Sequence, residues 1–291
     1  MPELPEVETV RRGLAEHVVG NKFKEITVLH RRATSPKSIA ALASLKGARV
    51  TEVARRGKFL WFKLDRPEVL VGHLGMSGQF LIQPRNAPDE RHLRVKISLG
   101  KLDLRFIDQR TFGWLGVDET RDGLPTYVKD IAADPFDTEF NLEETIERFK
   151  KKKTEIKRAL LDQGVMSGVG NIYADEALWR SKIHPESRTE TMKVSRIKEL
   201  IENATSVMSE ALLVGGTSFD DLYINVNGES GYFERSLAVY GQEGEACPRC
   251  GREIRRIKFA NRSSHFAQNV SPHRVLAEIG KPFSDRLRLC I

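Results

Sequence analysis

The sequence has few cysteines and no long apolar run. Its 291 residues include three cysteines, Cys247, Cys250 and Cys290, too few for the disulfide framework of a small secreted domain. No apolar stretch approaches the roughly 20 residues that a membrane-spanning helix needs. The opening Met-Pro-Glu-Leu-Pro-Glu segment is acidic and broken by prolines, unlike a secretory leader. We therefore expect a cytoplasmic protein.

Internal repeats are also absent, and the one low-complexity segment is the lysine run at 150–153. A composition of 40% hydrophobic and 30% charged residues is that of an ordinary globular protein, and the length allows two domains. The 47 basic against 40 acidic residues give a net charge of +7. This excess suits a polyanionic partner such as a nucleic acid but does not require one.

The first part of the chain combines one helix with a series of short strands. Val7, Val10, Leu14 and Val18 have helical spacing within 6–18. From about residue 21 to 117, β-rich runs are separated by Gly, Pro and Asp. They predict an antiparallel β-sandwich or barrel with strands at Ile26–Leu29, Val50–Val53, Phe59–Leu64, Val69–Leu74, Gln79–Ile82, Leu93–Leu99 and Leu102–Ile107.

The second part has helical apolar spacing, and the chain as a whole therefore predicts an α+β fold. The expected helices are Leu142–Phe149, Ile156–Leu161, Ile172–Trp179 and Val194–Leu213. The segment 247–262 is the most basic stretch and has the pattern of a β-hairpin. We expect a domain at 1–137, a helical domain at 138–232, and a hairpin with a divergent tail at 233–291.

The N-terminus carries a candidate nucleophile. If Met1 is removed, Pro2 presents a secondary α-amine, whose pKa of about 7.7–8.0 leaves a useful fraction unprotonated, unlike a lysine near 10.4. Attack of such an amine on a sugar C1′ gives a cationic iminium, which is an electron sink for elimination. Glu3 and Glu6 are placed to donate a proton or hold a cation. The alternative is an ordinary solvated helix start.

A series of short motifs decides between these interpretations. In chain order they are PELPEVE at 2–8, RGK at 56–58, LGMSG at 74–78, RFIDQRTFG at 105–113, GVGNIYADE at 168–176, and the Cys247-x-x-Cys250 pair. In this order they resemble the formamidopyrimidine-DNA glycosylase family over residues 2 to about 266. The resemblance implies an N-terminal β-sandwich, a helix–two-turn–helix domain and a zinc-finger hairpin. It also implies a monomer that binds double-stranded DNA containing oxidised bases or abasic sites.

The resemblance assigns four catalytic roles. Pro2 corresponds to the Schiff-base nucleophile, and Glu3 to the acid that helps to open the sugar ring. Lys58 corresponds to the proton donor of β-elimination and Arg262 to that of the following δ-elimination. The implied activity is removal of oxidised purines (formamidopyrimidines and 8-oxoguanine) with cleavage of the resulting abasic site. Taken alone, Lys58 could equally be a solvated cation.

Other motif residues correspond to DNA contacts. Met76, Arg110 and Phe112 resemble the residues that fill the gap left by a flipped base; as residue types, Met76 and Phe112 could equally be core. His92, Lys152 and Asn171 resemble further DNA contacts. The glycine-rich turn at 168–171, downstream of Lys151, Lys152 and Lys157, indicates a phosphate-binding surface, since such turns present backbone N–H groups. Residues 216–231 resemble a loop that covers the flipped base.

The zinc finger departs from the family pattern. Cys247 and Cys250 correspond to one ligand pair, but Ala-Gln-Asn-Val-Ser at 267–271 stands where the family has Cys-Pro-x-Cys-Gln. A structural zinc site needs four ligands, so we expect zinc to be bound weakly or not at all. The substitutes that the sequence offers are His265, His273 and Cys290, and none of them has Cys-x-x-Cys spacing.

Our hypothesis for this departure is the loss of one base from the gene. Ala-Gln-Asn-Val-Ser can be encoded GCC CAA AAT GTC AGC, and one T placed before it gives TGC CCA AAA TGT CAG, or Cys-Pro-Lys-Cys-Gln. The hypothesis is that the tail after Phe266 is frameshifted; simple substitution is the alternative. Two functional alternatives also stay open, an endonuclease VIII-like enzyme for oxidised pyrimidines and a non-catalytic protein that binds damaged DNA.

Overall fold

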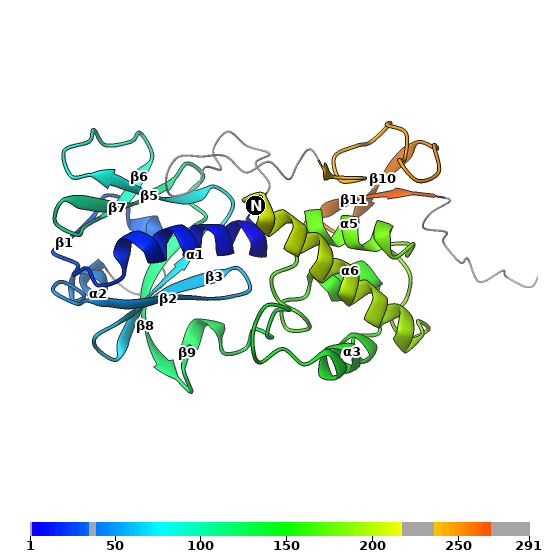
Figure 1. Cartoon of the computed structure of the whole chain (residues 1–291), viewed down its shortest axis with the longest axis horizontal. Coiled ribbons are helices and arrows are strands. Elements are labelled where there is room, and N and C mark those ends of the chain that lie inside the picture. Colours follow the sequence, from blue (N-terminus) through cyan, green and yellow to red (C-terminus); the bar gives the residue numbers. More distant parts are fainter. Residues whose placement is uncertain (1, 35–38, 217–235, 269–291) are drawn as a thin grey trace, which may run out of the picture.

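The computed structural model describes residues 2–34, 39–216 and 236–268, and Figure 1 shows how they are arranged. A β-rich half and a helical half lie side by side, and the N-terminus lies at their junction (Figure 1). A small hairpin packs on the helical half. The expected α+β fold is confirmed. None of the helices in these ranges is long and apolar enough to cross a membrane.

The β-rich half is a sandwich of two antiparallel sheets. One sheet has the strand order β1-β6-β7-β5 and the other β2-β3-β4-β8-β9. Side chains from both sheets, such as Phe62 and Phe80, are buried in a common core. The strands are β1 Glu25–Val28, β2 Val50–Arg56, β3 Phe59–Leu64, β4 Glu68–His73, β5 Gly78–Pro84, β6 Leu93–Ser98, β7 Leu102–Asp108, β8 Trp114–Arg121 and β9 Leu124–Pro125.

The predicted strands correspond to β1–β7 with small differences at their ends. The prediction was wrong in leaving out β8 and β9. In β8, four consecutive residues from Leu115 are buried and the last three are exposed, so the strand lacks the alternation that identifies a half-buried strand. Leu115 and Val117 face the sandwich core, and the turn at Thr126–Val128 packs on β8 through Asp118, so both faces of its first half are covered.

Helix α1 (Leu4–Val18) connects the two halves. Its predicted apolar face is confirmed, because Val7, Val10, Leu14 and Val18 are buried in the core of the sandwich. Leu4 is different: it is buried in the core of the helical half. The first turn of α1 therefore belongs to one half and the remaining turns to the other.

The helical half contains the predicted helices in nearly the predicted positions. They are α3 Leu142–Lys151, α4 Ile156–Leu161, α5 Asn171–Arg180 and α6 Val194–Leu213, and they share one apolar core. The short elements η1 Arg31–Ala33, α2 Ile39–Ala43 and η2 Thr126–Val128 belong to the N-terminal half. The expected hairpin is formed by β10 (Ile254–Phe259) and β11 (Arg262–Ala267), and β11 packs on α5.

Candidate active site and nucleic-acid interface

The N-terminal residues are fastened to the turn that precedes α5. The Glu3 carboxylate accepts hydrogen bonds from the backbone N–H groups of Gly170 (2.6 Å) and Ile172 (2.8 Å). The Leu4 N–H donates to the Gly168 carbonyl at 3.0 Å. Pro2, one residue earlier, is buried. The predicted nucleophile is therefore held at the junction by the two residues that follow it, Glu3 and Leu4.

The glycines of this turn make room for the N-terminus. A Cβ at Gly168, whose φ is +93°, would lie 2.4 Å from Leu4 Cδ1, and a Cβ at Gly170 would lie 2.3 Å from Glu3 Cδ. The interpretation of this turn as a phosphate site was therefore wrong in one respect. Its N–H groups at the start of α5 bind the protein's own carboxylate, which is the anion that a helix N-terminus favours.

Burial and neighbouring charges alter the proton affinities of the candidate acid and base. Burial raises the pKa of Glu3, against the opposing charge of Lys58, and the Glu6 carboxylate raises it further. Burial lowers the pKa of Lys58; Glu3 opposes this shift, and the guanidinium of Arg262 adds to it. The structure thus brings Glu3, Lys58 and Arg262 within electrostatic range. Opposite shifts of an acid and an amine toward neutrality are typical of proton-transfer sites.

Arg262 reaches the site from the hairpin. It begins β11 and is exposed, and the residue after it is fastened to the helical half. The Ser263 carbonyl accepts hydrogen bonds from Lys157 Nζ (2.9 Å) and Asn171 Nδ2 (3.1 Å). Asn171 is the first residue of α5, where Glu3 also binds. The hairpin and the N-terminus are therefore positioned by the same end of one helix.

Asp175 holds the hairpin in this place, a role that its motif, GVGNIYADE, does not reveal. Its buried carboxylate binds Lys157 Nζ at 2.6 Å, the Ser264 hydroxyl at 2.7 Å and the His265 N–H at 2.9 Å. Lys157 was expected on a phosphate-binding surface, and this expectation was wrong because its side chain is completely buried against Asp175. Burial lowers the pKa of Lys157, and the charge of Asp175 opposes the shift.

The predicted gap-filling residues lie together on two loops of the sandwich. Met76 is 38% exposed and Phe112 is 61% exposed, so the alternative that they are core residues is wrong. The Arg110 guanidinium lies 3.9 Å from the Met76 sulfur. An exposed apolar pair beside a planar cation is unusual on a surface and suits insertion between stacked bases.

Asp108 joins the two loops that carry these side chains. Its buried carboxylate accepts the Ser77 hydroxyl at 2.6 Å and the N–H groups of Gly113 (2.7 Å) and Arg110 (3.2 Å). The Asp108 N–H donates to the carbonyl of His92 at 3.0 Å, which places that half-buried residue beside the same loops. Asp108 belongs to the RFIDQRTFG motif, but the motif alone did not reveal this role.

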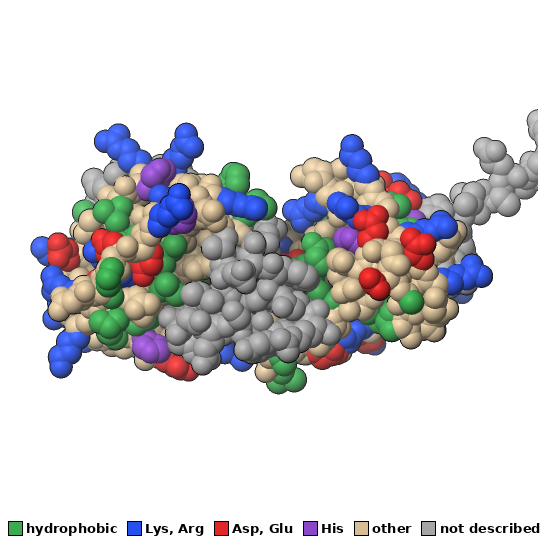
Figure 2. All heavy atoms as spheres, turned by 90° about the horizontal axis from the view of Figure 1, so that it is seen from above, with side chains coloured by type: hydrophobic (Ala, Val, Ile, Leu, Met, Phe, Trp, Pro, Cys, Tyr) green, Lys and Arg blue, Asp and Glu red, His purple; other side chains and the backbone are tan. Residues whose placement is uncertain are grey.

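Lys152 is a surface residue on the helical half. Its ammonium forms an ion pair with Asp162 at 2.6 Å. Figure 2 shows further lysine and arginine side chains on both lobes of the molecule, on either side of the junction. A polyanion that crosses the junction would therefore meet positive charge on both sides. The expected covering loop at 216–231 lies outside the described residues except for Gly216.

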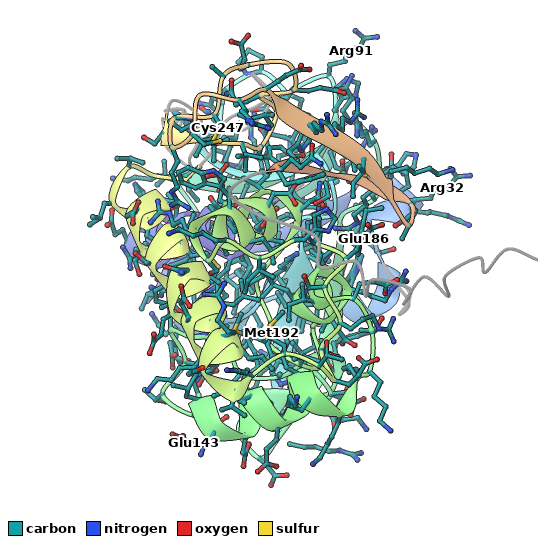
Figure 3. All side chains as sticks on the ribbon, turned by 90° about the vertical axis from the view of Figure 1, so that its right-hand side faces the viewer. Arg32, Arg91, Glu143, Glu186, Met192 and Cys247 are labelled. Carbon is teal, nitrogen blue, oxygen red and sulfur yellow. The ribbon has the colours of Figure 1, made fainter. Side chains whose placement is uncertain are left out.

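The finger segment supplies half of a metal site. Cys247 is buried and accepts a hydrogen bond from Trp179 Nε1 at 3.4 Å, and Figure 3 shows it beside the hairpin, far from Glu143 of α3. The side chain of Ala267 is buried in the same apolar cluster as Cys247 and Cys250. Within 2–34, 39–216 and 236–268, no three His, Cys, Asp or Glu side chains form a group that could hold a metal. The described residues therefore do not complete a tetrahedral zinc site.

The alternative ligands do not change this picture. His265 is turned toward Asp175, whose carboxylate lies 3.3 Å from its Nδ1. His273 and Cys290 lie outside the described residues.

Comparisons with known proteins agree with the geometry. Three family models match: the formamidopyrimidine-DNA glycosylase N-terminal domain at 1–115, the formamidopyrimidine-DNA glycosylase H2TH domain at 131–222, and a zinc finger found in FPG and IleRS at 244–266. Formamidopyrimidine-DNA glycosylase of Nocardioides sp. is 52% identical over 281 residues, covering 94% of this chain and 95% of the relative. That of Thermobifida fusca is 50% identical over 289 residues, covering 94% and 98%.

Solved structures show the same likeness. A variant of the Lactococcus lactis FPG in complex with DNA containing Fapy-dG has a TM-score of 0.87 and 35% identity, covering 94% of this chain and 100% of that chain. The L. lactis Fpg in complex with DNA containing an abasic site has a TM-score of 0.85 and 35% identity, covering 93% and 100%.

A β-sandwich led by a short helix, joined to a helix–two-turn–helix unit that receives the N-terminus, defines a class of two-domain DNA-binding proteins. Within that class, the chain belongs to the formamidopyrimidine-DNA glycosylase family.

Proposed function

We propose that this protein is a base-excision-repair DNA glycosylase that removes oxidised purines and then cleaves the abasic site, with the Pro2 amine as nucleophile. The observation that carries the proposal is the position of the N-terminus. Pro2 is buried at the domain junction, next to a carboxyl group with a raised pKa and near an amine with a lowered one. The names of the relatives and the DNA in the related crystals support the same substrate class.

The chemistry assigns one task to each residue. The Pro2 nitrogen attacks C1′ and replaces the departing base, and Glu3 donates a proton that opens the sugar ring. The resulting iminium draws electrons from C2′, so that loss of the C2′ proton expels the 3′ phosphate. Lys58 would donate a proton in this first elimination, and Arg262 would do so in the second. Met76, Arg110 and Phe112 would fill the space left in the duplex, while His92, Lys152 and Asn171 would contact its backbone.

Trapping with borohydride tests the nucleophile. A duplex with an abasic site should give a covalent adduct, and peptide mapping should place it on Pro2. A variant that retains Met1 should form none, because the reacting amine is displaced by one residue, about 3.8 Å, while its DNA affinity stays within a few fold. Lys58→Gln is the control and should still be trapped. An adduct mapped to Lys58 would contradict the proposal.

The finger is proposed to bind zinc weakly or not at all. The matched family model is that of a zinc finger, but the described residues provide only Cys247 and Cys250 as one ligand pair. No catalytic step is assigned to the metal. What zinc would supply is folding free energy, on the order of 10 kcal/mol in small metal-folded domains. In its place, the contacts of Asp175 fasten the described hairpin to α5.

Metal analysis of the purified protein checks this expectation. The chain should contain much less than one zinc per molecule. A variant with Ala267→Cys, Gln268→Pro, Asn269→Lys and Val270→Cys should contain one, because Ala267 already packs with Cys247 and Cys250. Its affinity for DNA should also increase. Stoichiometric zinc in the unaltered chain would show that two of His265, His273 and Cys290 complete the site. Sequencing the gene across codon 267 tests the frameshift hypothesis.

A further inference from the structure

The loop that carries Lys58 is held from the segment between the two halves of the molecule. Asp134 lies there, and its side chain is completely buried. Its Oδ2 atom accepts the Gly57 N–H at 2.9 Å and Arg55 Nη1 at 2.7 Å, and its Oδ1 atom accepts Arg55 Nη2 at 3.2 Å. One carboxylate thus binds both the backbone N–H just before Lys58 and the side chain of Arg55 near the end of β2.

The same loop is packed tightly on the turn that receives the N-terminus. Gly57 has φ +55°, and a Cβ there would lie 2.8 Å from both Cβ and Oγ of Ser167. Ser167 immediately precedes Gly168, which binds Leu4. A small movement of the loop would therefore change the distance between Lys58 and the N-terminal residues.

Arg55 extends this connection to the helix that follows the nucleophile. Its Nε donates to the Glu8 carboxylate of α1 at 3.1 Å. Burial alone would lower the pKa of Arg55, but the charges of Asp134 and Glu8 and their hydrogen bonds raise it, so the guanidinium stays protonated. Charge therefore alternates along three contacting side chains: Glu8 of α1, Arg55 of β2 and Asp134 of the segment between the two halves.

Lys58 depends on this backbone support. Among the described residues, no hydrogen bond or ion pair to its ammonium group is found, so its position follows from the loop on which it stands. We propose that Asp134 is a positioning residue for Lys58, which it places for proton transfer by fixing Gly57 and Arg55. This inference rests on the proposed lyase function.

Substitution of Asp134 should slow one step selectively. A displacement of about 1 Å at a catalytic group can reduce a rate about a hundredfold. Asp134→Ala removes every acceptor and should reduce strand cleavage at a preformed abasic site about a hundredfold. Asp134→Asn keeps an acceptor for Gly57 and should recover part of this loss, to a reduction of about tenfold. Borohydride trapping, which reports the reaction of Pro2, should change less than twofold in Asp134→Asn.

Asp137→Asn is the matched control. Asp137 lies in the same segment and pairs with the adjacent Arg56 at 3.0 Å, but it does not bind Gly57. Its cleavage and trapping rates should both stay within twofold of those of the unaltered protein. The proposal is overturned if cleavage and trapping fall together in Asp134→Asn, if neither changes, or if Asp137→Asn has the same effect. An unaltered protein that gives no trapped adduct would refute the lyase function itself.

Discussion

At the scale of single residues, Glu3 is both the proposed catalytic acid and a structural contact between α1 and α5. Its backbone caps α1, and its carboxylate binds the start of α5. Burial raises its pKa despite the nearby charge of Lys58. A carboxyl group with a raised pKa keeps its proton to higher pH, so it can serve as an acid closer to neutrality. The contacts that fix Glu3 therefore also hold Pro2, the preceding residue in the chain, at the same junction.

Replacement of Glu3 should separate base removal from cleavage of an abasic site. Glu3→Gln should slow base removal by about a hundredfold or more, the lower range for loss of a general acid. Trapping on a preformed abasic site should fall much less, because that sugar opens without the acid. In the unaltered protein, base removal should decline as pH rises through the raised pKa of Glu3, and single-turnover assays of the variant should lack this decline. Equal losses on both substrates would contradict the assigned role.

The buried carboxylates could not have been predicted from the sequence. Asp134 binds a backbone N–H that is 77 residues away, and no spacing or periodicity reveals such a pair. Asp108 and Asp175 are similar cases. Each lies in a recognisable motif, but the motif does not reveal which segment of the chain the carboxylate binds. The prediction for Lys157 was wrong for the same reason. Its place close to a run of lysines suggested a phosphate contact, but its ammonium group binds Asp175 of α5.

At the scale of elements, the two loops carrying Met76, Arg110 and Phe112 behave as one unit because Asp108 bonds to both. Asp108→Asn would set an amide N–H against the N–H of Gly113 or lose the Ser77 contact. A buried group left unsatisfied costs about 1–3 kcal/mol. The unit should therefore loosen without unfolding of the sandwich.

Binding to damaged DNA should report this loosening. We expect Asp108→Asn to raise the Kd for a duplex with an abasic site about tenfold, which corresponds to about 1.4 kcal/mol. Asp118→Asn is the control, since Asp118 of β8 is another buried carboxylate of the sandwich but bonds to Thr126 and Tyr127 of η2. If both variants lower the Tm equally and weaken binding equally, Asp108 acts only on stability.

Elements with clear periodicity were predictable, and the others were not. The valines and leucine of α1 follow the helical period, and its buried face matches the prediction. The period carries no information about Leu4, which continues the same helix but is buried in the other half. In β8 both faces are covered at one end, so its residues do not alternate between buried and exposed as most of those in β6 do.

At the scale of the whole molecule, the net charge of +7 favours DNA, but individual cations are already paired. Lys152 is bound to Asp162, and a phosphate must compete with that carboxylate. Lys152→Ala should weaken binding to damaged and undamaged duplexes alike, and it should reduce the slope of log K against log salt by about one unit.

Asp162→Asn should have the opposite effect, because it releases Lys152 for phosphate. We expect a several-fold tighter Kd on both duplexes, measured at two or more salt concentrations. A loss confined to damaged DNA in Lys152→Ala would mean that this residue reads the lesion rather than the backbone.

The burial of Leu4 in the second core also orders events during synthesis of the protein. That core extends to Ala211, so it is complete only after some two hundred further residues have been made. Domains fold as units while the chain emerges, the N-terminal one first. The first turn of α1 is therefore exposed on a folded sandwich until the helices of the second half have been made and have folded. Pro2 is buried in the finished protein, so the amine that the proposed reaction needs is most open to processing before the helices have folded.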